Sequence, residues 1–520
     1  MKKARFILIG SFIILLSPFQ TIMAQNINTI HDTIYSEILK EKRIIEVLLP
    51  EIQKSDTNEK YDVLYVTDGE WNMKIISPIY QYLAEKWLIP KNIIISIPHN
   101  NLQGVNLRNR DLIPPHDNDS LAGRADNFLS FLKNELIPYV NKTYQTSGKN
   151  TISGGSLGGT FIMYALLMEP QLFDSYIAGD PAFWWDDYYI NKVAAEKMHD
   201  LPGIKTLFMT GRGARDGADY RSMGIYSMDS IITAKSPKGL HWKSIAYPDE
   251  THRSSLLKTI YDGLRFMYDG YDGTNSTGQV DVKFHPMNGV LLKNKPYKIL
   301  PPPGIYYLNL RYTTDGTEPS ETSRKFQGFD LTGEAVLNLK LFSASGRYDH
   351  NQTGNFKIGN VFPAIAKSKN MQPGGLHYAY YKGEWDSLPD FKKLKPDQAG
   401  IIGEAYGFLN LPNQNKLACL IEGYMEIKED GYYSLLIDTD DAAKLYLRDQ
   451  LIIGYDGIDK NMQLQTYLLP LEKGFYPLRL EYFQKKGGWP LRFNYQPQGA
   501  WQTKPVPLEQ LYSSPVSKTR

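Results

Sequence analysis

Thr151-Ile-Ser-Gly-Gly-Ser156-Leu-Gly-Gly-Thr160 is the stretch from which the fold of this 520-residue chain can be worked out. It contains the pattern G-x-S-x-G, with Gly154, Ser156 and Gly158 in the fixed positions. The pattern is typical of a tight turn from a buried strand into a helix, which presents the serine hydroxyl at its tip. The neighbours must be small because a Cβ would collide with the adjoining strand and helix. So short a pattern is weak alone, and its surroundings decide what it means.

Around the pattern, short apolar runs alternate along the chain with segments whose apolar residues have helical spacing. Short apolar runs bounded by turn residues predict buried strands, and apolar residues three and four apart predict helices. We expect strands at 33–50, 61–67, 92–98, 150–153, 175–179, 205–210 and 242–247, and helices at 71–87, 127–144 (kinked or ended by Pro138) and 160–168. Strands that alternate with helices indicate an α/β sheet.

Five segments together resemble the esterase D-like branch of the α/β-hydrolases, which includes siderophore, feruloyl and acetylxylan esterases. They are Tyr65-Val-Thr-Asp-Gly69, Arg108-Asn-Arg-Asp111, Phe128-Leu-Ser-Phe-Leu-Lys-Asn-Glu-Leu-Ile-Pro138, Ser153-Gly-Gly-Ser-Leu-Gly-Gly159 and Pro248-Asp-Glu-Thr-His252. The resemblance implies a serine esterase domain over residues 26–275.

Acyl transfer by a serine needs a base, an acid that orients the base, and donors for the oxyanion. The resemblance implies Ser156 as nucleophile and His252, after the last strand, as base. For the acid we expect Asp216, with Asp219 as reserve, after the strand that ends at Thr210. Asp180 follows the preceding strand, a position that some hydrolases use, but we interpret it as fixing its loop.

The resemblance also implies the surroundings of the serine. The main-chain N–H groups of Glu70 and Leu157 would form the oxyanion hole, and Trp184 and Trp185 would line the substrate cleft. Arg108 and Arg110 could hold a substrate anion, but we favour an ion pair with Asp111. No cofactor is required for this chemistry.

Composition and the first residues bear on the cellular compartment. Lys+Arg number 58 and Asp+Glu 56, which argues against nucleic acid as a partner. Residues 1–25, with three basic residues before the apolar stretch 6–19, read as a signal peptide, and no later stretch could span a bilayer. Cys419 is the only cysteine, so no intramolecular disulfide forms. We expect an exported protein of the periplasm, cell surface or medium.

Two all-β sandwich modules are predicted after a Gly/Asp-rich linker at 268–278. Residues 280–360 resemble a chitobiase C-terminal module through Arg311-Tyr-Thr-Thr-Asp-Gly-Thr-Glu-Pro-Ser320, and we interpret them as a spacer. Residues 372–512 resemble the protective-antigen-type sandwich, whose members include sugar binders.

Calcium is a candidate ligand of the last module. Some relatives of this type bind sugar through Ca²⁺ on adjacent aspartates, here Asp440 and Asp441. Two carboxylates are too few for Ca²⁺ without further ligands, so we favour a role in stabilising the turn.

Three functions remain open from the sequence. The first is a secreted serine esterase acting on a carbohydrate acetyl or feruloyl ester, with the β-modules bound to a glycan or cell surface. The second is a siderophore esterase, acting on a catecholate ester. The third is a glycan-binding protein whose hydrolase domain has lost its activity.

Overall fold

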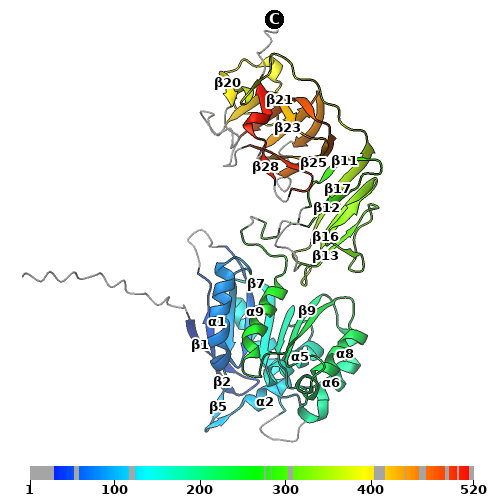
Figure 1. Cartoon of the computed structure of the whole chain (residues 1–520). Coiled ribbons are helices and arrows are strands. Elements are labelled where there is room, and N and C mark those ends of the chain that lie inside the picture. Colours follow the sequence, from blue (N-terminus) through cyan, green and yellow to red (C-terminus); the bar gives the residue numbers. More distant parts are fainter. Residues whose placement is uncertain are drawn as a thin grey trace, which may run out of the picture. The chain divides into compact units, whose positions relative to one another are not determined.

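A computed structural model gives the architecture of the chain (Figure 1). It describes residues 29–51, 58–115, 123–274, 277–280, 282, 284–301, 308–402, 416–439, 441–455, 464–485, 491–500 and 503–513. The predicted signal peptide lies outside these ranges. The chain forms two compact units that divide between Met267 and Tyr268, with residues 87–89 belonging to the second. No helix among the described residues is long and apolar enough to cross a membrane.

An eight-stranded mixed sheet forms the first unit, in the order β1-β2-β4-β3-β7-β8-β9-β10. Within this sheet β4, β3, β7, β8, β9 and β10 run parallel to one another, and β2 is antiparallel to both of its neighbours, β1 and β4. This is the predicted α/β-hydrolase architecture, and it is confirmed. The strands are β1 (Thr29–Ser36), β2 (Glu41–Leu48), β3 (Tyr61–Thr67), β4 (Asn92–Ile97), β7 (Thr146–Gly155), β8 (Ser175–Gly179), β9 (Lys205–Arg212) and β10 (Leu240–Tyr247).

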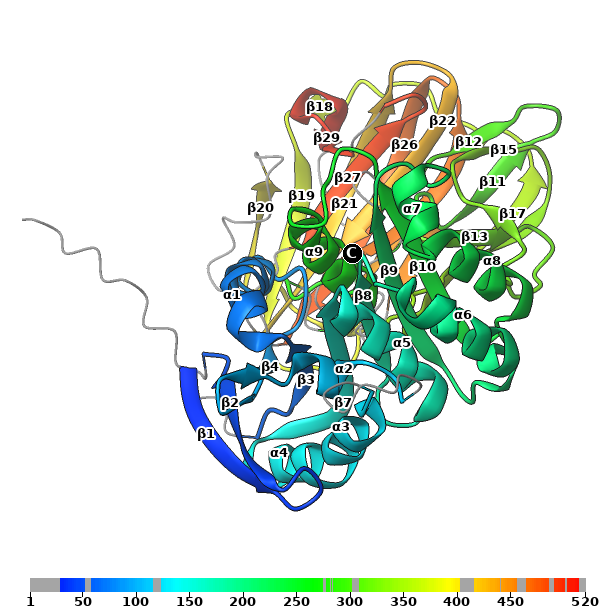
Figure 2. The same ribbon diagram turned by 90° about the horizontal axis from the view of Figure 1, so that it is seen from below.

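Helices cover both faces of this sheet (Figures 1 and 2). Helices α1 and α9 pack together on one face, where Gly263 of α9 lies against Ile177 and Phe208. Helix α5 packs on β7 and β8 from the other face, beside α2 and α6. Covered on both sides, β3, β4 and β8 are buried at every residue, which explains their unbroken apolar runs. The helices are α1 (Gly69–Glu85), α2 (Arg108–Leu112), α3 (Ala125–Phe131), α4 (Ile137–Thr143), α5 (Leu157–Met168), α6 (Trp185–Lys197), α7 (Ala218–Ser222), α8 (Ile225–Lys235) and α9 (Ser255–Met267).

Two predicted elements differ in detail from the structure. The segment 33–50, expected as one strand, is the hairpin β1–β2, and the carboxylate of Glu135 accepts hydrogen bonds from the turn amides of Glu37 and Ile38. The helix expected at 127–144 contains a π-helical turn, Leu132–Leu136, between α3 and α4. Pro138 follows that turn, and because its nitrogen carries no hydrogen it cannot continue the regular α-helical ladder.

Among the described residues of the second unit, the regular elements are strands and short 3₁₀ turns. Its nine-stranded sheet has the order β14-β13-β16-β17-β11-β25-β22-β27-β28, and a second sheet packs beside it in the order β18-β29-β21-β26-β23-β24, with β19 and β20 attached through β21. The strands of the first are β11 (Asn288–Leu292), β13 (Leu310–Thr313), β14 (Arg324–Lys325), β16 (Ala335–Leu341), β17 (His350–Gly359), β22 (Gly431–Asp438), β25 (Leu464–Leu471), β27 (Arg492–Pro497) and β28 (Lys504–Pro505). Those of the second are β18 (Gln372–Pro373), β19 (Leu376–Lys382), β20 (Gln398–Ile402), β21 (Leu417–Ile427), β23 (Ala442–Leu447), β24 (Gln450–Tyr455), β26 (Gly474–Gln484) and β29 (Leu511–Ser513).

The nine-stranded sheet joins the two β-modules that the sequence separates. Strand β11, from the predicted spacer, pairs with β17 on one side and with β25 of the following module on the other. Gly289 permits the second pairing, because a Cβ there would lie 2.4 Å from Cβ of Leu468. The Tyr432 hydroxyl, on β22, accepts from the N–H of Leu292 and donates to the carbonyl of Lys295. The predicted spacer is therefore part of one continuous sheet.

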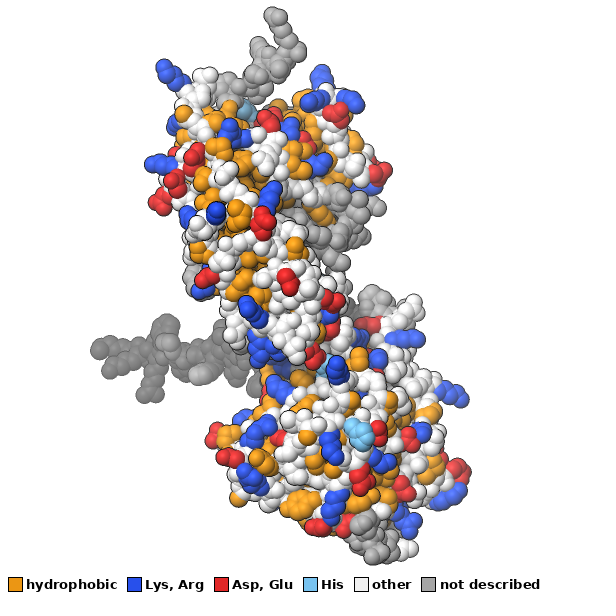
Figure 3. Space-filling view, turned by 90° about the vertical axis from the view of Figure 1, so that its right-hand side faces the viewer, with side chains coloured by type: hydrophobic (Ala, Val, Ile, Leu, Met, Phe, Trp, Pro, Cys, Tyr) orange, Lys and Arg blue, Asp and Glu red, His pale blue; other side chains and the backbone are white. Residues whose placement is uncertain are grey.

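Charges are mixed over the surface. Figure 3 shows acidic and basic side chains interspersed on the face that it displays, without a broad area of one sign. This agrees with the near balance of charges in the sequence.

One ion-pair network is buried in the first unit. Arg43 on β2 is 2% exposed and lies 2.6 Å from Asp111, which is also 2% exposed. Its guanidinium also stacks against Phe128 and Phe131. Arg110 bridges Asp111 and Glu41 at 2.8 and 2.7 Å, so the preferred structural pairing of Arg110 with Asp111 is what the structure contains.

The substitution Asp111→Ala should strongly destabilise the first unit. It leaves the buried Arg43 without its main carboxylate, a loss that typically costs about 3–5 kcal/mol of unfolding free energy. Denaturant unfolding followed by circular dichroism would measure this. The matched control is Glu169→Ala, which removes the exposed pair with Lys133 and should cost under about 1 kcal/mol. Equal losses in the two variants would contradict the assignment.

Candidate functional site

Ser156 occupies the turn between β7 and α5, as predicted. Its backbone has φ 57° and ψ −120°, a conformation that residues other than glycine rarely adopt. The turn is held by hydrogen bonds from the Ser156 N–H to the Gly179 carbonyl and from the Ala182 N–H to the Ser156 carbonyl. The strained backbone is thus fixed from the neighbouring strand β8 and the loop after it.

The glycines of the motif are required by space. A Cβ on Gly154 would lie 2.5 Å from Oγ1 of Thr67 and 2.8 Å from the backbone of Gly158. A Cβ on Gly158 would lie 2.7 Å from the same Thr67 oxygen. Both glycines therefore let the turn approach the end of β3, which is the reason the motif predicts for them.

His252 lies in the turn between β10 and α9, and its imidazole contacts Asp180. Nδ1 of His252 is 2.5 Å from Oδ2 of Asp180, and the histidine side chain is 44% exposed. Nδ1 also lies 3.3 Å from Arg212. Because a carboxylate only accepts and its contact is the shorter one, the arrangement favours a proton on Nδ1 and leaves Nε2 able to accept a proton.

Asp180 is a buried carboxylate at the end of β8. Its side chain is 2% exposed, and it accepts from the Arg212 guanidinium at 2.6 Å and from the Arg212 N–H at 3.2 Å. Burial alone would raise the pKa of this carboxyl, but hydrogen bonds from His252 and Arg212, together with the charge of Arg212, lower it below its ordinary value. Asp180 therefore stays ionised beside the imidazole.

The two acids chosen from the sequence do not contact His252. Asp216 is exposed, and its main-chain carbonyl accepts from Arg221. Asp219, 63% exposed, lies 3.4 Å from Nε of Arg212. The choice of Asp216, with Asp219 as reserve, stays a prediction, while the carboxylate that contacts His252 in the structure is that of Asp180. The sequence signal for Asp180 is an aspartate directly after a buried strand beside the serine strand.

The main-chain amides of Glu70 and Leu157, which are expected to form the oxyanion hole, lie in the first turns of two helices. Glu70 is in the first turn of α1 and Leu157 opens α5, positions where amides have no partner within their own helix. The strands before them, β3 and β7, are parallel neighbours in the sheet. The two amides therefore begin their helices at the same edge of the sheet, and there they attract negative charge.

A second cluster, which the sequence did not assign, surrounds Asp68 at this edge. Asp68 has the left-handed φ of 55°, is 3% exposed and is held by Arg108 through two hydrogen bonds of 2.8 Å. Nε2 of His99 lies 2.5 Å from the same carboxylate. Arg108 thus pairs with Asp68 and not with Asp111. Burial raises the pKa of Asp68, but Arg108 and His99 outweigh it and lower the pKa.

Exposed tryptophans lie in the loop after β8 and in the first turn of α1, which follows β3. Trp184 is 47% exposed and its ring lies 5.5 Å from that of the half-buried Trp185, in the segment after Asp180. On the β3 side, Trp71 is 53% exposed and lies against His99 and Arg108. The expected wall of Trp184 and Trp185 remains a prediction, and Trp71 adds a further aromatic surface.

Of the two calcium candidates, only Asp441 is among the described residues. Asp441 accepts from the main-chain N–H of Lys485 at 2.5 Å, while Asp440 lies outside the described residues. Within the described ranges, no three His, Cys, Asp or Glu side chains gather as metal ligands would. Calcium binding by Asp440 and Asp441 stays an untested prediction.

Two family models match the chain. Residues 36–226 match the model described as "Putative esterase", and residues 375–508 match the PA14 domain. The first match contains Ser156, Asp180 and Arg212 and ends before His252. The resemblance of residues 280–360 to a chitobiase module stays a prediction.

Several known proteins are similar to the first unit. The ferri-bacillibactin esterase BesA of Bacillus subtilis is 29% identical over 150 residues, which are 28% of this chain and 52% of that protein. The siderophore triacetylfusarinine C esterase of Aspergillus fumigatus is 30% identical over 135 residues, 25% of this chain and 46% of that protein. Among solved structures, the IroE-like serine hydrolase from Shewanella oneidensis is 30% identical, with a TM-score of 0.42 over 46% of this chain and 79% of that chain. The chain spans about half the length of these two curated relatives.

Proposed function

We propose that the first unit is a serine esterase that hydrolyses a carboxylic ester through an acyl-enzyme. The observation that carries the proposal is the contact of 2.5 Å between His252 and the buried Asp180, at the same sheet edge as the strained Ser156 turn. Similarity to esterases over residues 36–226 supports it. Ser156 follows β7, Asp180 follows β8 and His252 follows β10, and this order along parallel strands supports the proposal.

The mechanism follows from the chemistry of these groups. Oγ of Ser156 attacks the ester carbonyl carbon while Nε2 of His252 takes its proton, and the carbonyl oxygen becomes an oxyanion. The Glu70 and Leu157 N–H groups stabilise that oxyanion, at roughly 3 kcal/mol each. His252 then protonates the departing alcohol, and water attacks the acyl-serine by the same route in reverse. Asp180 remains a carboxylate and stabilises the imidazolium.

For the substrate we propose a siderophore ester. One relative is named a ferri-bacillibactin esterase and another a siderophore triacetylfusarinine C esterase. The exposed rings of Trp71 and Trp184 suit a substrate with flat aromatic acyl groups such as catecholates. The carbohydrate ester expected from the sequence is the second candidate, favoured by the appended all-β unit. An exported location remains a prediction from residues 1–25.

Ser156→Ala should abolish covalent labelling by a fluorophosphonate probe. The probe reacts only with an activated serine, so the wild-type chain should label at one site and the variant should not. Gel fluorescence and mass spectrometry of the labelled peptide would measure this. A folded wild-type chain that stays unlabelled would contradict the esterase proposal and favour a binding protein with an inactive hydrolase domain.

Asp180→Asn should lower kcat by about 10⁴-fold, by analogy with other triads, with little change in KM. The neutral amide no longer stabilises the imidazolium or selects its tautomer. Hydrolysis of p-nitrophenyl acetate would measure it, and the melting temperature would show that the variant is folded.

Asp216→Asn and Asp219→Asn are the matched controls, because both carboxylates are exposed and neither contacts His252. Each should retain kcat within about threefold. A large loss in Asp216→Asn with a small one in Asp180→Asn would restore the assignment made from the sequence.

A panel of esters would separate the two substrate classes. Catecholate triesters should be hydrolysed with a kcat/KM above that of feruloylated or acetylated oligosaccharides if the substrate is a siderophore. Trp71→Ala and Trp184→Ala should then raise KM for the catecholate esters and change that for p-nitrophenyl acetate much less. The reverse order of kcat/KM would favour the carbohydrate ester.

A further inference from the structure

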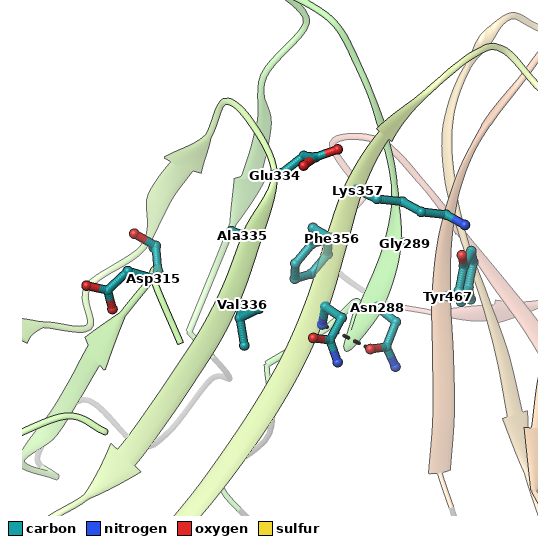
Figure 4. A pocket seen from close by; sticks show the side chains of 11 residues that line it. Asn288, Gly289, Asp315, Glu334, Ala335, Val336, Phe356, Lys357 and Tyr467 are labelled. Atoms are coloured by element: carbon teal, nitrogen blue, oxygen red, sulfur yellow. Dashed lines mark hydrogen bonds between the residues drawn. The ribbon is translucent and has the colours of Figure 1, made fainter. Parts of the chain in front are cut away.

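A groove in the second unit lies far in sequence from the proposed esterase site. It has a volume of about 590 Å³, within the range of small-ligand pockets, and lies where β16, β17, β11 and β25 run side by side (Figure 4). Its lining comes from both β-modules: Asn288 and Lys357 from one, and Tyr467 from the other.

The pairing of strands brings the central residues of the groove into one row. Val336 is the partner of Asn355, Asn355 of Asn288, and Asn288 of Tyr467. Asp315 extends the row through a bridge to Val336. Directly paired residues point to the same face of a sheet. The row therefore presents a carboxylate, an apolar side chain, two amides and an aromatic ring across four adjacent strands and the Asp315 turn.

Gly289 is what brings the aromatic ring into the row. Its missing Cβ lets β25 approach β11, since that Cβ would lie 2.4 Å from Leu468. Leu468 is fully buried in the core of the predicted spacer, so its neighbour Tyr467 lies on the opposite face of β25. There Tyr467 is half-buried, packs partly against the core of the later module and lines the groove beside Asn288. The ring is thus placed by the joining of the two modules and not by either alone.

Hydrogen bonds within the protein orient the polar side chains of the groove. Oδ1 of Asn288 accepts from the N–H of Asn355 at 3.0 Å, so its amide nitrogen remains as a donor (Figure 4). Oδ1 of Asp315 accepts from the N–H and hydroxyl of Thr317, and these hydrogen bonds lower the pKa of the Asp315 carboxyl. Glu334 lines the rim, and Lys357 extends toward Tyr467.

The chemistry of the lining selects among ligand classes. Carboxylates only accept hydrogen bonds, an ammonium only donates, and amides do both. A hydroxyl both donates and accepts, so a ligand rich in hydroxyls can hydrogen-bond to the carboxylates, the ammonium and the amides alike. The C–H face of such a ligand can lie on the ring of Tyr467. Two carboxylates disfavour a polyanion. A peptide strand would find no free sheet edge, because β17, β11 and β25 are paired with one another.

We propose that this groove binds a neutral oligosaccharide. The site is independent of the proposed ester hydrolysis, since none of its residues belongs to the first unit. It assigns to the predicted spacer, residues 280–360, a direct part in holding a ligand. It also gives the appended unit a role that needs no metal ion.

The test is calorimetric titration of the full chain carrying Ser156→Ala, so that no ester is turned over. The probes are cello-, xylo-, manno- and chito-oligosaccharides of three to six units, with a polygalacturonate oligomer as the anionic comparison. One neutral series should bind with a stoichiometry of one. Asn355→Ala and Tyr467→Ala should each raise its Kd roughly 3- to 10-fold, as expected for one hydrogen bond or one ring contact.

The matched control is Asn351→Ala. Asn351 is exposed on the same strand and face as Asn355 but outside the groove, so Kd should stay within twofold. Tyr467→Phe keeps the ring and should bind nearly as the parent chain does, which separates loss of contact from unfolding. The proposal is overturned if no neutral series binds at millimolar concentration, if the anionic oligomer binds more tightly, or if Asn355→Ala and Tyr467→Ala leave Kd unchanged.

Discussion

The buried carboxylate of Asp180 sets the arrangement around the proposed esterase site. A carboxylate so deeply buried is tolerated only when its charge is balanced and its oxygens accept hydrogen bonds. Arg212, at the end of β9, supplies a guanidinium and a main-chain N–H, and His252 supplies its ring from the turn before α9. One negative charge therefore ties together the ends of β8 and β9 and the loop after β10. The exposed imidazole of His252 gains a fixed orientation from this buried partner.

Close packing provides the second constraint, on the other side of the serine. The end of β3 approaches the turn so closely that only glycine fits at Gly154 and Gly158, and Oδ2 of Asp68 would lie 3.0 Å from a Cβ on Gly158. Asp68 in turn is held in a left-handed conformation by Arg108 and His99. The loop that carries the Glu70 amide is thus fixed by charge pairing and by contact with the serine turn.

Local signals in the sequence were enough to predict the fold of the first unit, but not the contact between Asp180 and His252 or the joining of the β-modules in the second unit. Apolar runs and the spacing of Gly154, Ser156 and Gly158 located the strands, the helices and the turn, because burial and steric limits act over a few residues. Asp180 was passed over because several aspartates follow strands, and only the pairing with Arg212 and His252, 32 and 72 residues away, distinguishes one of them. The union of the β-modules depends on a two-residue pairing between β11 and β25, which leaves no periodic pattern in either segment.

Because of that pairing, each of the two β-modules needs the other to complete its sheet. Strand β25 loses its neighbour β11 if residues 280–360 are removed, and β11 loses its neighbour β25 if the later module is removed. Either loss would expose a row of unpaired amides and carbonyls, which invites edge-to-edge association between chains. Recombination at the short segment 360–371 would therefore give fragments prone to aggregate, and the PA14 match, which begins at residue 375, covers only part of the nine-stranded sheet.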